Sequence, residues 1–292
     1  MQFQFSDKNP HHPVTYASFF SMHTRIELVA TGFTEAKGRE LAQSIEAEVK
    51  AMEHRFNRFD DTSPMSVVNM RATNEAVTVD DELFMALELC EAFRRGTGGY
   101  FDVATASAAT DEGYAVSYLL DPKKHTVKFT HQGVSLDLGG FAKGFALEQV
   151  CRRVREAGAE NALINFGNSS VAAIGHHPYG ECWSVGVEHT KVKGTMAREI
   201  KLNNGAMSVS GRNSDGVYHI VNPITGGLVA GDELVIVEGR SALVCEVLST
   251  ALYAAPRAQR SVIMKQYEGY TATELYCREG GSCEIRTIDC NK

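Results

Sequence analysis

The stretch SLDLGGFAKGFALEQV, residues 135–150, constrains the fold of this chain more than any other. Around its start, apolar residues alternate with smaller or polar ones, which predicts a short strand over 133–138. From residue 141 on, apolar residues recur at helical spacing and predict a helix over about 141–156. Between the two lie Gly139 and Gly140, which let the backbone bend sharply or approach another group closely. The sequence therefore predicts a turn without side chains between a strand and a helix.

Two interpretations of this turn are open. A helix N-terminus behind glycines offers free N–H groups and partial positive charge to an anion, and Lys143 in the first turn adds a full charge. Alternatively, the glycines only permit close packing of strand and helix, with Lys143 in solvent. The local residues favour packing, because neither GK[ST] nor GxGxxG is present to mark a known phosphate loop.

Length and charge narrow the class of protein. A chain of 292 residues forms one large domain or two smaller ones, and its net charge of −7 argues against nucleic acid as the main partner. No apolar run reaches the roughly 18–20 residues of a membrane span. The first 20 residues lack a basic region, a continuous apolar region and an early cysteine, so no signal peptide or lipobox is visible. We therefore expect a cytoplasmic protein.

The seven cysteines fit a reducing compartment better than a disulfide framework, since their number is odd and no CxxC pair occurs. Cys90, Cys151 and Cys245 fall in predicted helices, where we expect them to be buried packing residues. The histidine pairs at 11–12 and 176–177 lack a convincing ligand set, so no zinc site is predicted.

The order of predicted elements indicates an α+β fold. Residues 56–69 are expected to be a polar, turn-rich stretch. Predicted helices cover 34–56, 80–94, 141–156 and 241–254. Predicted strands cover 24–31, 126–130, 133–138, 161–166, 170–174, 183–188, 199–202, 207–209, 217–221, 234–238, 261–265 and 272–277.

Several segments together resemble one protein family. DLGGFAKG at 137–144 is similar to the signature of the ApbE family, the FAD:protein FMN transferases. Further similar segments follow in the family's order: SMHT at 21–24, FNRFDDTSPMSVVN at 56–69, GGYFDV at 98–103, NFGNSSVAAIG at 165–175, HIVNPITG at 219–226 and CEVLSTAL at 245–252. The resemblance covers roughly residues 20–275.

The resemblance implies an ApbE-like fold, with a mixed β-sheet core, flanking helices and a flavin cleft between two lobes. The transferase domain would cover 21–280, after an N-terminal extension at 1–20 and before a tail at 281–292. It also implies an Mg²⁺-dependent transferase that cleaves FAD, attaches FMN through a phosphoester to a Thr or Ser of a target protein and releases AMP. FAD and a target with a flavinylation-type motif are the expected partners, with no nucleic acid and no membrane span. The alternatives are an FAD pyrophosphatase that gives FMN and AMP, and an FAD-binding protein with weakened catalysis.

The metal site is implied by the match to CEVLSTAL and to the glycine turn. Glu246 and Thr250 would supply side-chain oxygens to Mg²⁺, Gly140 a backbone carbonyl, and Ser249 a direct or water-mediated contact. Their i, i+4 spacing places Glu246 and Thr250 on one face of the predicted helix. Without the family, a solvated helix face would explain both residues.

The resemblance also implies which residues contact FAD. They are Met22, Phe59, Tyr100, Phe101, Asp102, Asp137, Lys143 and Val221. Lys143 would also act in catalysis by facing the phosphates, and His219 would transfer a proton or contact phosphate. Core packing is the alternative for Met22 and Phe59, and a turn cap is the alternative for Asp137.

Four places differ from the common family pattern. Pro64 replaces a Glu, Asn168-Ser169 replaces Gly-Asp, and Arg212 stands where an acid is common. Glu246 replaces the metal-ligand Asp, which keeps a carboxylate but adds one methylene to its reach. Such changes could alter the surface for the target, favour hydrolysis, or leave a flavin binder without turnover.

Overall fold

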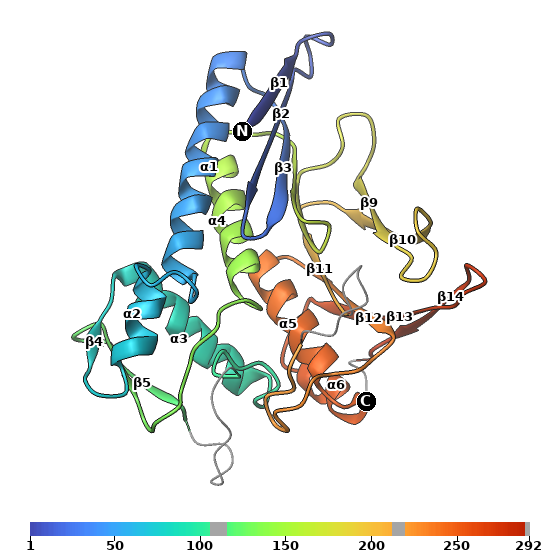
Figure 1. Cartoon of the computed structure of the whole chain (residues 1–292). Coiled ribbons are helices and arrows are strands. Elements are labelled where there is room, and N and C mark those ends of the chain that lie inside the picture. Colours follow the sequence, from blue (N-terminus) through green and yellow to red (C-terminus); the bar gives the residue numbers. More distant parts are fainter. Residues whose placement is uncertain (106–115, 212–219, 290–292) are drawn as a thin grey trace.

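A nine-stranded sheet runs through the molecule. The computed structural model describes residues 1–105, 116–211 and 220–289, and within them every strand pairing of this sheet is antiparallel. The strands follow the order β1-β2-β3-β7-β8-β11-β12-β13-β14 (Figure 1). Their bounds are β1 Gln2–Ser6, β2 Val14–Ser21, β3 Thr24–Thr31, β7 Ala162–Phe166, β8 Ser170–Ile174, β11 Ala206–Ser210, β12 Glu233–Gly239, β13 Thr271–Cys277 and β14 Cys283–Thr287.

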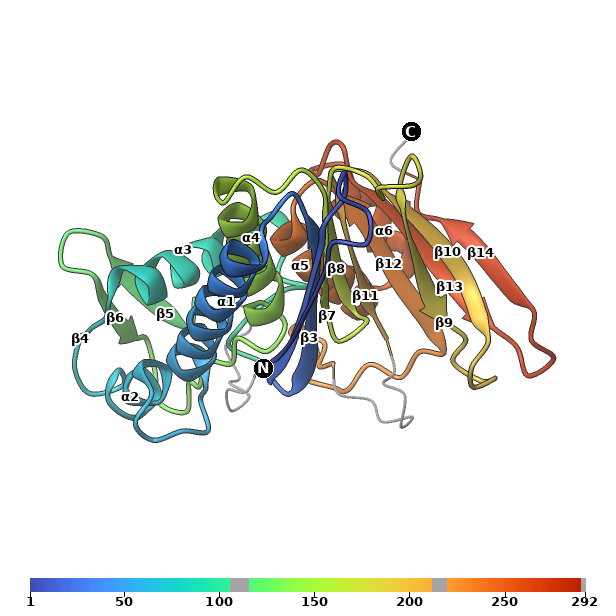
Figure 2. The ribbon, with the colours of Figure 1, turned by 90° about the horizontal axis from the view of Figure 1, so that it is seen from above.

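Helices cover one face of this sheet, as Figure 2 shows for α1, α4 and α5. The long helix α1 begins after Thr34, whose side chain accepts a hydrogen bond from the Lys37 N–H and so satisfies one free donor of the first turn. Its apolar stripe is buried against the sheet and α4. The helices are α1 Glu35–Phe56, α2 Pro64–Arg71, α3 Asp81–Gly96, α4 Ala142–Glu156, α5 Ala242–Ala254 and α6 Arg257–Met264.

A separate hairpin of β9 (Trp183–Glu188) and β10 (Met196–Leu202) covers the opposite face of the sheet (Figure 2). Strand β8 is buried on both sides, because Val171 and Ala173 belong to the core under this hairpin and Ala172 belongs to the core under the helices. The sheet therefore separates two hydrophobic cores.

A second lobe lies beside the helical layer in Figure 1. It contains α2, α3 and a small sheet in the order β4-β6-β5. These strands are β4 Val77–Thr78, β5 Tyr118–Asp121 and β6 Thr126–Phe129. The expected sheet core with flanking helices is confirmed, but the described pairings of the main sheet are all antiparallel, so the sheet is not of the mixed kind expected.

Some expected elements differ from the structure. Residues 261–265, expected to form a strand, lie mostly in α6, and the polar stretch 56–69 contains the start of α2. The segment 133–138 forms no strand, although residues 134–138 alternate between buried and half-buried. Residues 1–20, treated above as an extension, contribute β1 and most of β2 to the main sheet. The expected strand at 217–221 lies largely outside the described residues.

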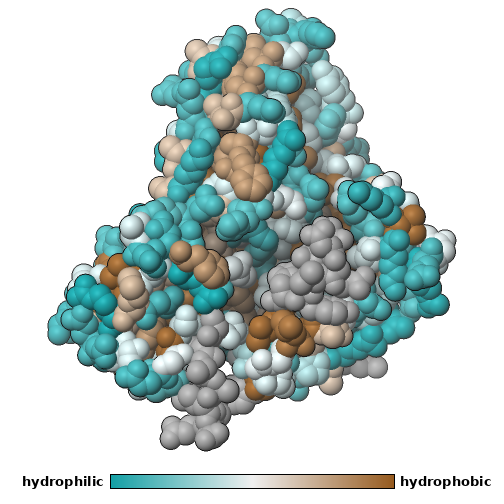
Figure 3. Space-filling view, viewed as in Figure 1, coloured by the Kyte–Doolittle hydropathy of each residue, from teal (hydrophilic) through white to brown (hydrophobic). Residues whose placement is uncertain are grey.

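Among the helices described, none has the length and apolar composition needed to cross a bilayer. The face shown in Figure 3 is mostly hydrophilic, with hydrophobic side chains in small, separate groups. This distribution is ordinary for a folded domain surface.

Candidate active site

A cleft of about 1440 Å³ opens beside the glycine turn. Its walls come from the turn, from the β7–β8 loop, from the end of β11, from α5, and from β9 and the loop after it. The predicted site residues that line it are Tyr100, Phe101, Asp102, Asp137, Gly140, Lys143, Val221, Glu246 and Thr250. Residues far apart in sequence are thus brought to one cavity.

The segment before the glycine turn is held by a side chain instead of a neighbouring strand. Asn69 on α2 accepts a hydrogen bond from the Leu136 N–H at 2.8 Å and donates one to the Leu136 carbonyl at 2.9 Å. The Asp137 N–H donates to the Val103 carbonyl at 2.7 Å. Because these partners satisfy the backbone, the predicted strand at 133–138 does not form a ladder.

The glycines allow close approach between elements of this chain. A Cβ added to Gly140 would lie 3.4 Å from Thr250 Cγ2 and 3.6 Å from Phe101. A Cβ on Gly144 would lie only 2.5 Å from Glu246 Cβ, so this glycine permits α4 to lie directly against α5. Close packing therefore requires a glycine at Gly144 within α4, whereas a Cβ at Gly140 would make ordinary van der Waals contacts. Lys143 is ion-paired instead of solvated, so the packing interpretation of the turn is not confirmed.

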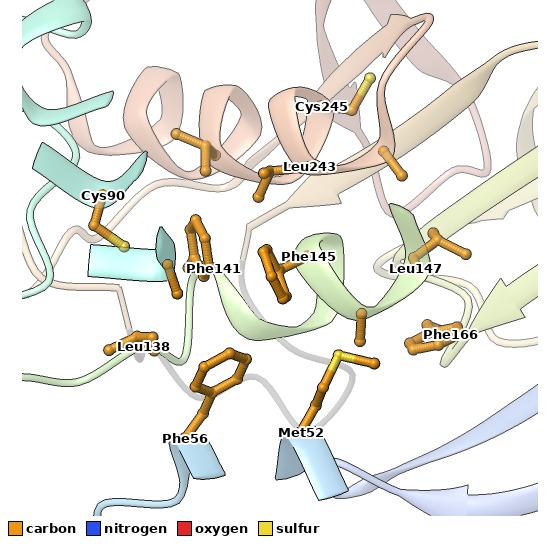
Figure 4. Packing of buried hydrophobic residues seen from close by; sticks show 14 of the residues in the cluster. Met52, Phe56, Cys90, Leu138, Phe141, Phe145, Leu147, Phe166, Leu243 and Cys245 are labelled. Atoms are coloured by element: carbon orange, nitrogen blue, oxygen red, sulfur yellow. The ribbon is translucent and has the colours of Figure 1, made fainter. Parts of the chain in front are cut away.

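Figure 4 shows the packing that fixes α4 in this place. The ring of Phe145 lies between Phe56 of α1 and Phe141, with ring centroids 5.6 Å and 5.4 Å away. Leu243 of α5 belongs to the same buried cluster. A rigid helix thus carries Lys143, one residue before Gly144, into the cleft.

Lys143 and Glu246 form the charged centre of the cleft. Lys143 Nζ lies 3.1 Å from Glu246 Oε1 and also donates to Ser169 Oγ at 3.2 Å. The hydroxyls of Ser170 on β8 and Ser208 on β11 both donate to Glu246 Oε2, the second at 2.7 Å. Only 5% of the Glu246 side chain is exposed, so these donors replace the water that a buried carboxylate loses.

A row of hydroxyls continues from this carboxylate. Ser249 and Thr250 each donate back to the Glu246 carbonyl, at 3.0 and 3.1 Å. Ser210 Oγ on β11 lies 2.8 Å from Ser249 Oγ and 3.3 Å from Thr250 Oγ1. Ser249 is fully buried behind the cleft wall, whereas Thr250 reaches the cavity. The site is therefore rich in hard oxygen donors, the class that Mg²⁺ prefers.

Asp137 is placed at the turn by two contacts. Its Oδ1 accepts from the Gly139 N–H at 2.9 Å, which is the turn cap considered above. Its Oδ2 lies 3.0 Å from Arg58 Nε, and the Arg58 guanidinium lies over the Phe59 ring at 4.6 Å. Arg58 lines the cleft but was missed by the sequence reasoning, which noted only its aromatic neighbour.

Asp102 lines the same cleft. Burial raises the pKa of this carboxyl above its ordinary value, although the Ala104 N–H at 2.8 Å and the charge of Arg94 partly oppose the shift. Phe101 beside it is buried, and Tyr100 is half-buried. The wall thus combines an aromatic surface with a carboxyl that is protonated more readily than usual.

Two predicted FAD contacts are not among the residues that line the cleft. Met22 sits in the β2–β3 turn with a φ of 51°, and its N–H donates to Glu53 at 2.7 Å. Phe59 is 77% exposed. Neither is among the residues that line the cleft, so their contact with FAD stays a prediction. His219 lies outside the described residues.

The seryl side chains around Glu246 were also missed by the sequence reasoning. Ser170, Ser208 and Ser210 lie on β8 and β11, and only the pairing of these strands brings them together beneath α5. An isolated serine in a strand gives no such indication. Cys90, Cys151 and Cys245 are buried, as expected.

Comparison with known proteins agrees with this architecture. The chain is 23% identical over 260 residues to a protein from Treponema pallidum named FAD:protein FMN transferase, with 74% of this chain and 71% of that protein aligned. It is 25% identical over 202 residues to one of the same name from Chlamydia muridarum, covering 59% of this chain and 60% of that protein.

Solved structures show the same fold. The crystal structure of the ApbE protein from Thermotoga maritima superposes with a TM-score of 0.78 and 26% identity, over 93% of this chain and 96% of that one. The flavin transferase ApbE from Vibrio cholerae gives 0.77 with 16% identity, over 94% and 97%, and supports the fold alone. The model of the ApbE family matches residues 22–273. This chain belongs to the ApbE family.

Proposed function

We propose that this protein is an Mg²⁺-dependent FAD:protein FMN transferase that attaches FMN to a Thr or Ser of a target protein and releases AMP. The observation that carries the proposal is the Lys143–Glu246 pair, with its row of hydroxyls, beside the glycine turn in one cleft. The names of the Treponema and Chlamydia relatives support the same activity.

The donor set fits a magnesium ion. A carboxylate and hydroxyls face the cavity, and a Cβ on Gly140 would touch Thr250, so the turn backbone and this hydroxyl are close neighbours. Glu246, Thr250 and the Gly140 carbonyl would hold the ion, with Ser249 supporting them from behind. When bound, Mg²⁺ would neutralise negative charge on the pyrophosphate.

The chain's own groups would do the remaining work. Lys143 would neutralise a phosphate oxygen, and the wall of Tyr100 and Phe101 would offer the flavin an aromatic surface. The acceptor hydroxyl attacks the phosphorus on the FMN side, a new P–O bond forms, and the bond to the AMP phosphate breaks. We assign the removal of the hydroxyl proton to His219.

The deciding experiment combines the purified chain, FAD, MgCl₂ and an acceptor domain bearing a flavinylation-type Thr motif. Mass spectrometry should show one FMN on the acceptor for each AMP released, and EDTA should abolish both. Glu246→Ala should lower the rate at least about 100-fold, whereas Glu156→Ala, at an exposed carboxylate on α4, should leave it unchanged. Free FMN with unmodified acceptors across several domains would instead assign the chain to the hydrolytic alternative.

A further inference from the structure

A cluster of His189, Cys277 and Cys283 lies on the face of the sheet away from α4 and α5. One ring nitrogen of His189 and both cysteine sulfurs lie within 4.8 Å of one another. Cys277 belongs to the core beneath the β9–β10 hairpin, and Cys283 packs against it half-buried. His189 also lines the cleft, whereas neither cysteine is among the residues that line it.

The two cysteines are direct partners across the β13–β14 hairpin. The Arg278 N–H donates to the Ser282 carbonyl at 2.9 Å, which makes 278 and 282 a hydrogen-bonded pair. Because such pairs alternate along an antiparallel ladder, Cys277 and Cys283 occupy the non-hydrogen-bonded position, where side chains approach most closely. Their sulfurs lie 3.0 Å apart, and the roughly 4.5 Å between Cα atoms expected at this position falls within the range that a disulfide spans.

The histidine is not arranged as a metal ligand. Its Nδ1 accepts hydrogen bonds from the backbone N–H groups of Lys191 at 3.1 Å and Val192 at 3.0 Å. In the neutral ring the hydrogen is then on Nε2, so neither nitrogen offers a free lone pair. A metal-bound histidine shows the reverse pattern, in which the second ring nitrogen donates. Nε2 is buried without a hydrogen-bond partner, and one nitrogen of the same ring lies within 4.8 Å of both sulfurs.

We propose that Cys277 and Cys283 form a reversible intramolecular disulfide, and that the buried Nε2–H of His189 stabilises the thiolate during exchange. The oxidant is a small-molecule disulfide such as oxidised glutathione. The Cys283 thiolate attacks one sulfur of the oxidant and releases a thiol. Cys277 then attacks the Cys283 sulfur of the mixed disulfide and releases the second thiol, so two protein protons and two electrons are lost.

The environment of Cys283 sets the pH dependence of this exchange. Burial, followed by the hydrogen bond with Cys277, raises the pKa of the Cys283 thiol. The thiolate fraction therefore increases about tenfold for each unit of pH between 7 and 9, and the rate should follow it.

The test incubates the full chain in glutathione buffers of increasing oxidised fraction, followed by unfolding, alkylation and peptide mass spectrometry. Peptides containing Cys277 and Cys283 should become linked with loss of two hydrogens, and dithiothreitol should reverse the link. Cys283→Ser should abolish the link, and Cys277→Ala should abolish it independently. Cys182→Ser, at a half-buried cysteine outside the cluster, is the matched control and should leave the link unchanged.

The role of His189 has its own readout. His189→Leu should slow formation of the link at least about threefold at pH 8, and equal rates would refute that role.

The disulfide itself is refuted if both thiols remain fully alkylated in the most oxidising buffer, or if glutathione stays attached to Cys283. Equimolar zinc that is lost in Cys277→Ala would likewise overturn the proposal in favour of a metal site. FMN transfer is not measured, so failure here leaves the proposed function unaffected.

Discussion

Lys143 and Glu246 form an ion pair whose two members differ in exposure: 27% of the lysine side chain is exposed, against 5% of the glutamate. Both residues line the cavity, but the carboxylate is almost completely buried and is held by Ser170 and Ser208. The two residues therefore respond differently when the partner is removed. Lys143 can turn to solvent if Glu246 is lost, but Glu246 stays buried if Lys143 is lost.

Lys143→Met should therefore lower the free energy of unfolding more than Glu246→Gln does. Breaking a buried pair costs about 3–5 kcal/mol when the remaining charge stays buried. With two hydroxyl donors left on the carboxylate, we expect about 2–3 kcal/mol for Lys143→Met and about 1 kcal/mol for Glu246→Gln, measured by urea unfolding at pH 7. The reverse order would show that solvent reaches Glu246. Lys50→Met, at the Lys50–Glu46 pair on α1 whose lysine is exposed, is the control and should cost under about 0.5 kcal/mol.

Gly144→Ala tests the contact between α4 and α5. Alanine favours a helix over glycine by about 1 kcal/mol, so local propensity predicts stabilisation. The new Cβ would instead lie 2.5 Å from Glu246 Cβ and 3.1 Å from Leu243 Cα. We expect overpacking to dominate and the free energy of unfolding to fall by about 2–3 kcal/mol.

The control for that experiment is Gly280→Ala in the β13–β14 turn, where an added Cβ meets nothing within 4 Å. Thermal unfolding of both variants gives the comparison. Equal stability of Gly144→Ala and the parent would mean that the two helices can separate without cost.

The sequence predicted most of this architecture because α1, α3, α4 and α5 have clear helical periods and lie where the pattern indicates. It failed at 261–265, where short apolar runs fit either period. Arg260 is buried there between Glu274 and Glu233, and these ion pairs with β13 and β12 come only from the tertiary structure. The same limit applies in the site: a turn-capping Asp137 could be inferred locally, but not its partner Arg58.

Asp102 should give stability a measurable pH dependence. Its pKa is raised in the folded chain by burial, so the folded state holds this proton at pH values where the unfolded state has lost it. Below its ordinary pKa this carboxyl is protonated in both states and does not change the free energy of unfolding. As the pH rises through the raised pKa, the carboxyl lowers the free energy of unfolding progressively. Each unit of pKa difference corresponds to about 1.4 kcal/mol.

Asp102→Asn removes that titration and keeps an oxygen that can accept from the Ala104 N–H. The stability of the variant relative to the parent should increase between pH 4 and pH 7, as measured by urea unfolding. The exposed Asp61→Asn is the matched control and should show no such trend. A constant difference across this range for Asp102→Asn would contradict the raised pKa.

Arg58 offers the sharpest test of flavin binding, because it lines the cleft and lies beside Asp137 at the glycine turn. A hydrogen bond from a guanidinium to a charged group contributes about 1.5–3 kcal/mol, which corresponds to about 10–100-fold in affinity. Arg58→Met removes this charge from the cavity and leaves Asp137 facing an anionic pyrophosphate. We expect the Kd for FAD, measured by flavin fluorescence, to rise by that factor.

Arg55→Met is the control for this prediction. Arg55 also pairs with carboxylates, lying 3.0 Å from Asp80 and 2.8 Å from Glu82, but it is not among the residues that line the cleft. Its loss should leave the Kd for FAD within about twofold of the parent value.

Riboflavin, which has no phosphate, should bind the parent and Arg58→Met equally if the guanidinium acts on the pyrophosphate. A matching loss of riboflavin affinity would show that Arg58 supports the ring site, through its contact with Phe59, instead of the phosphates.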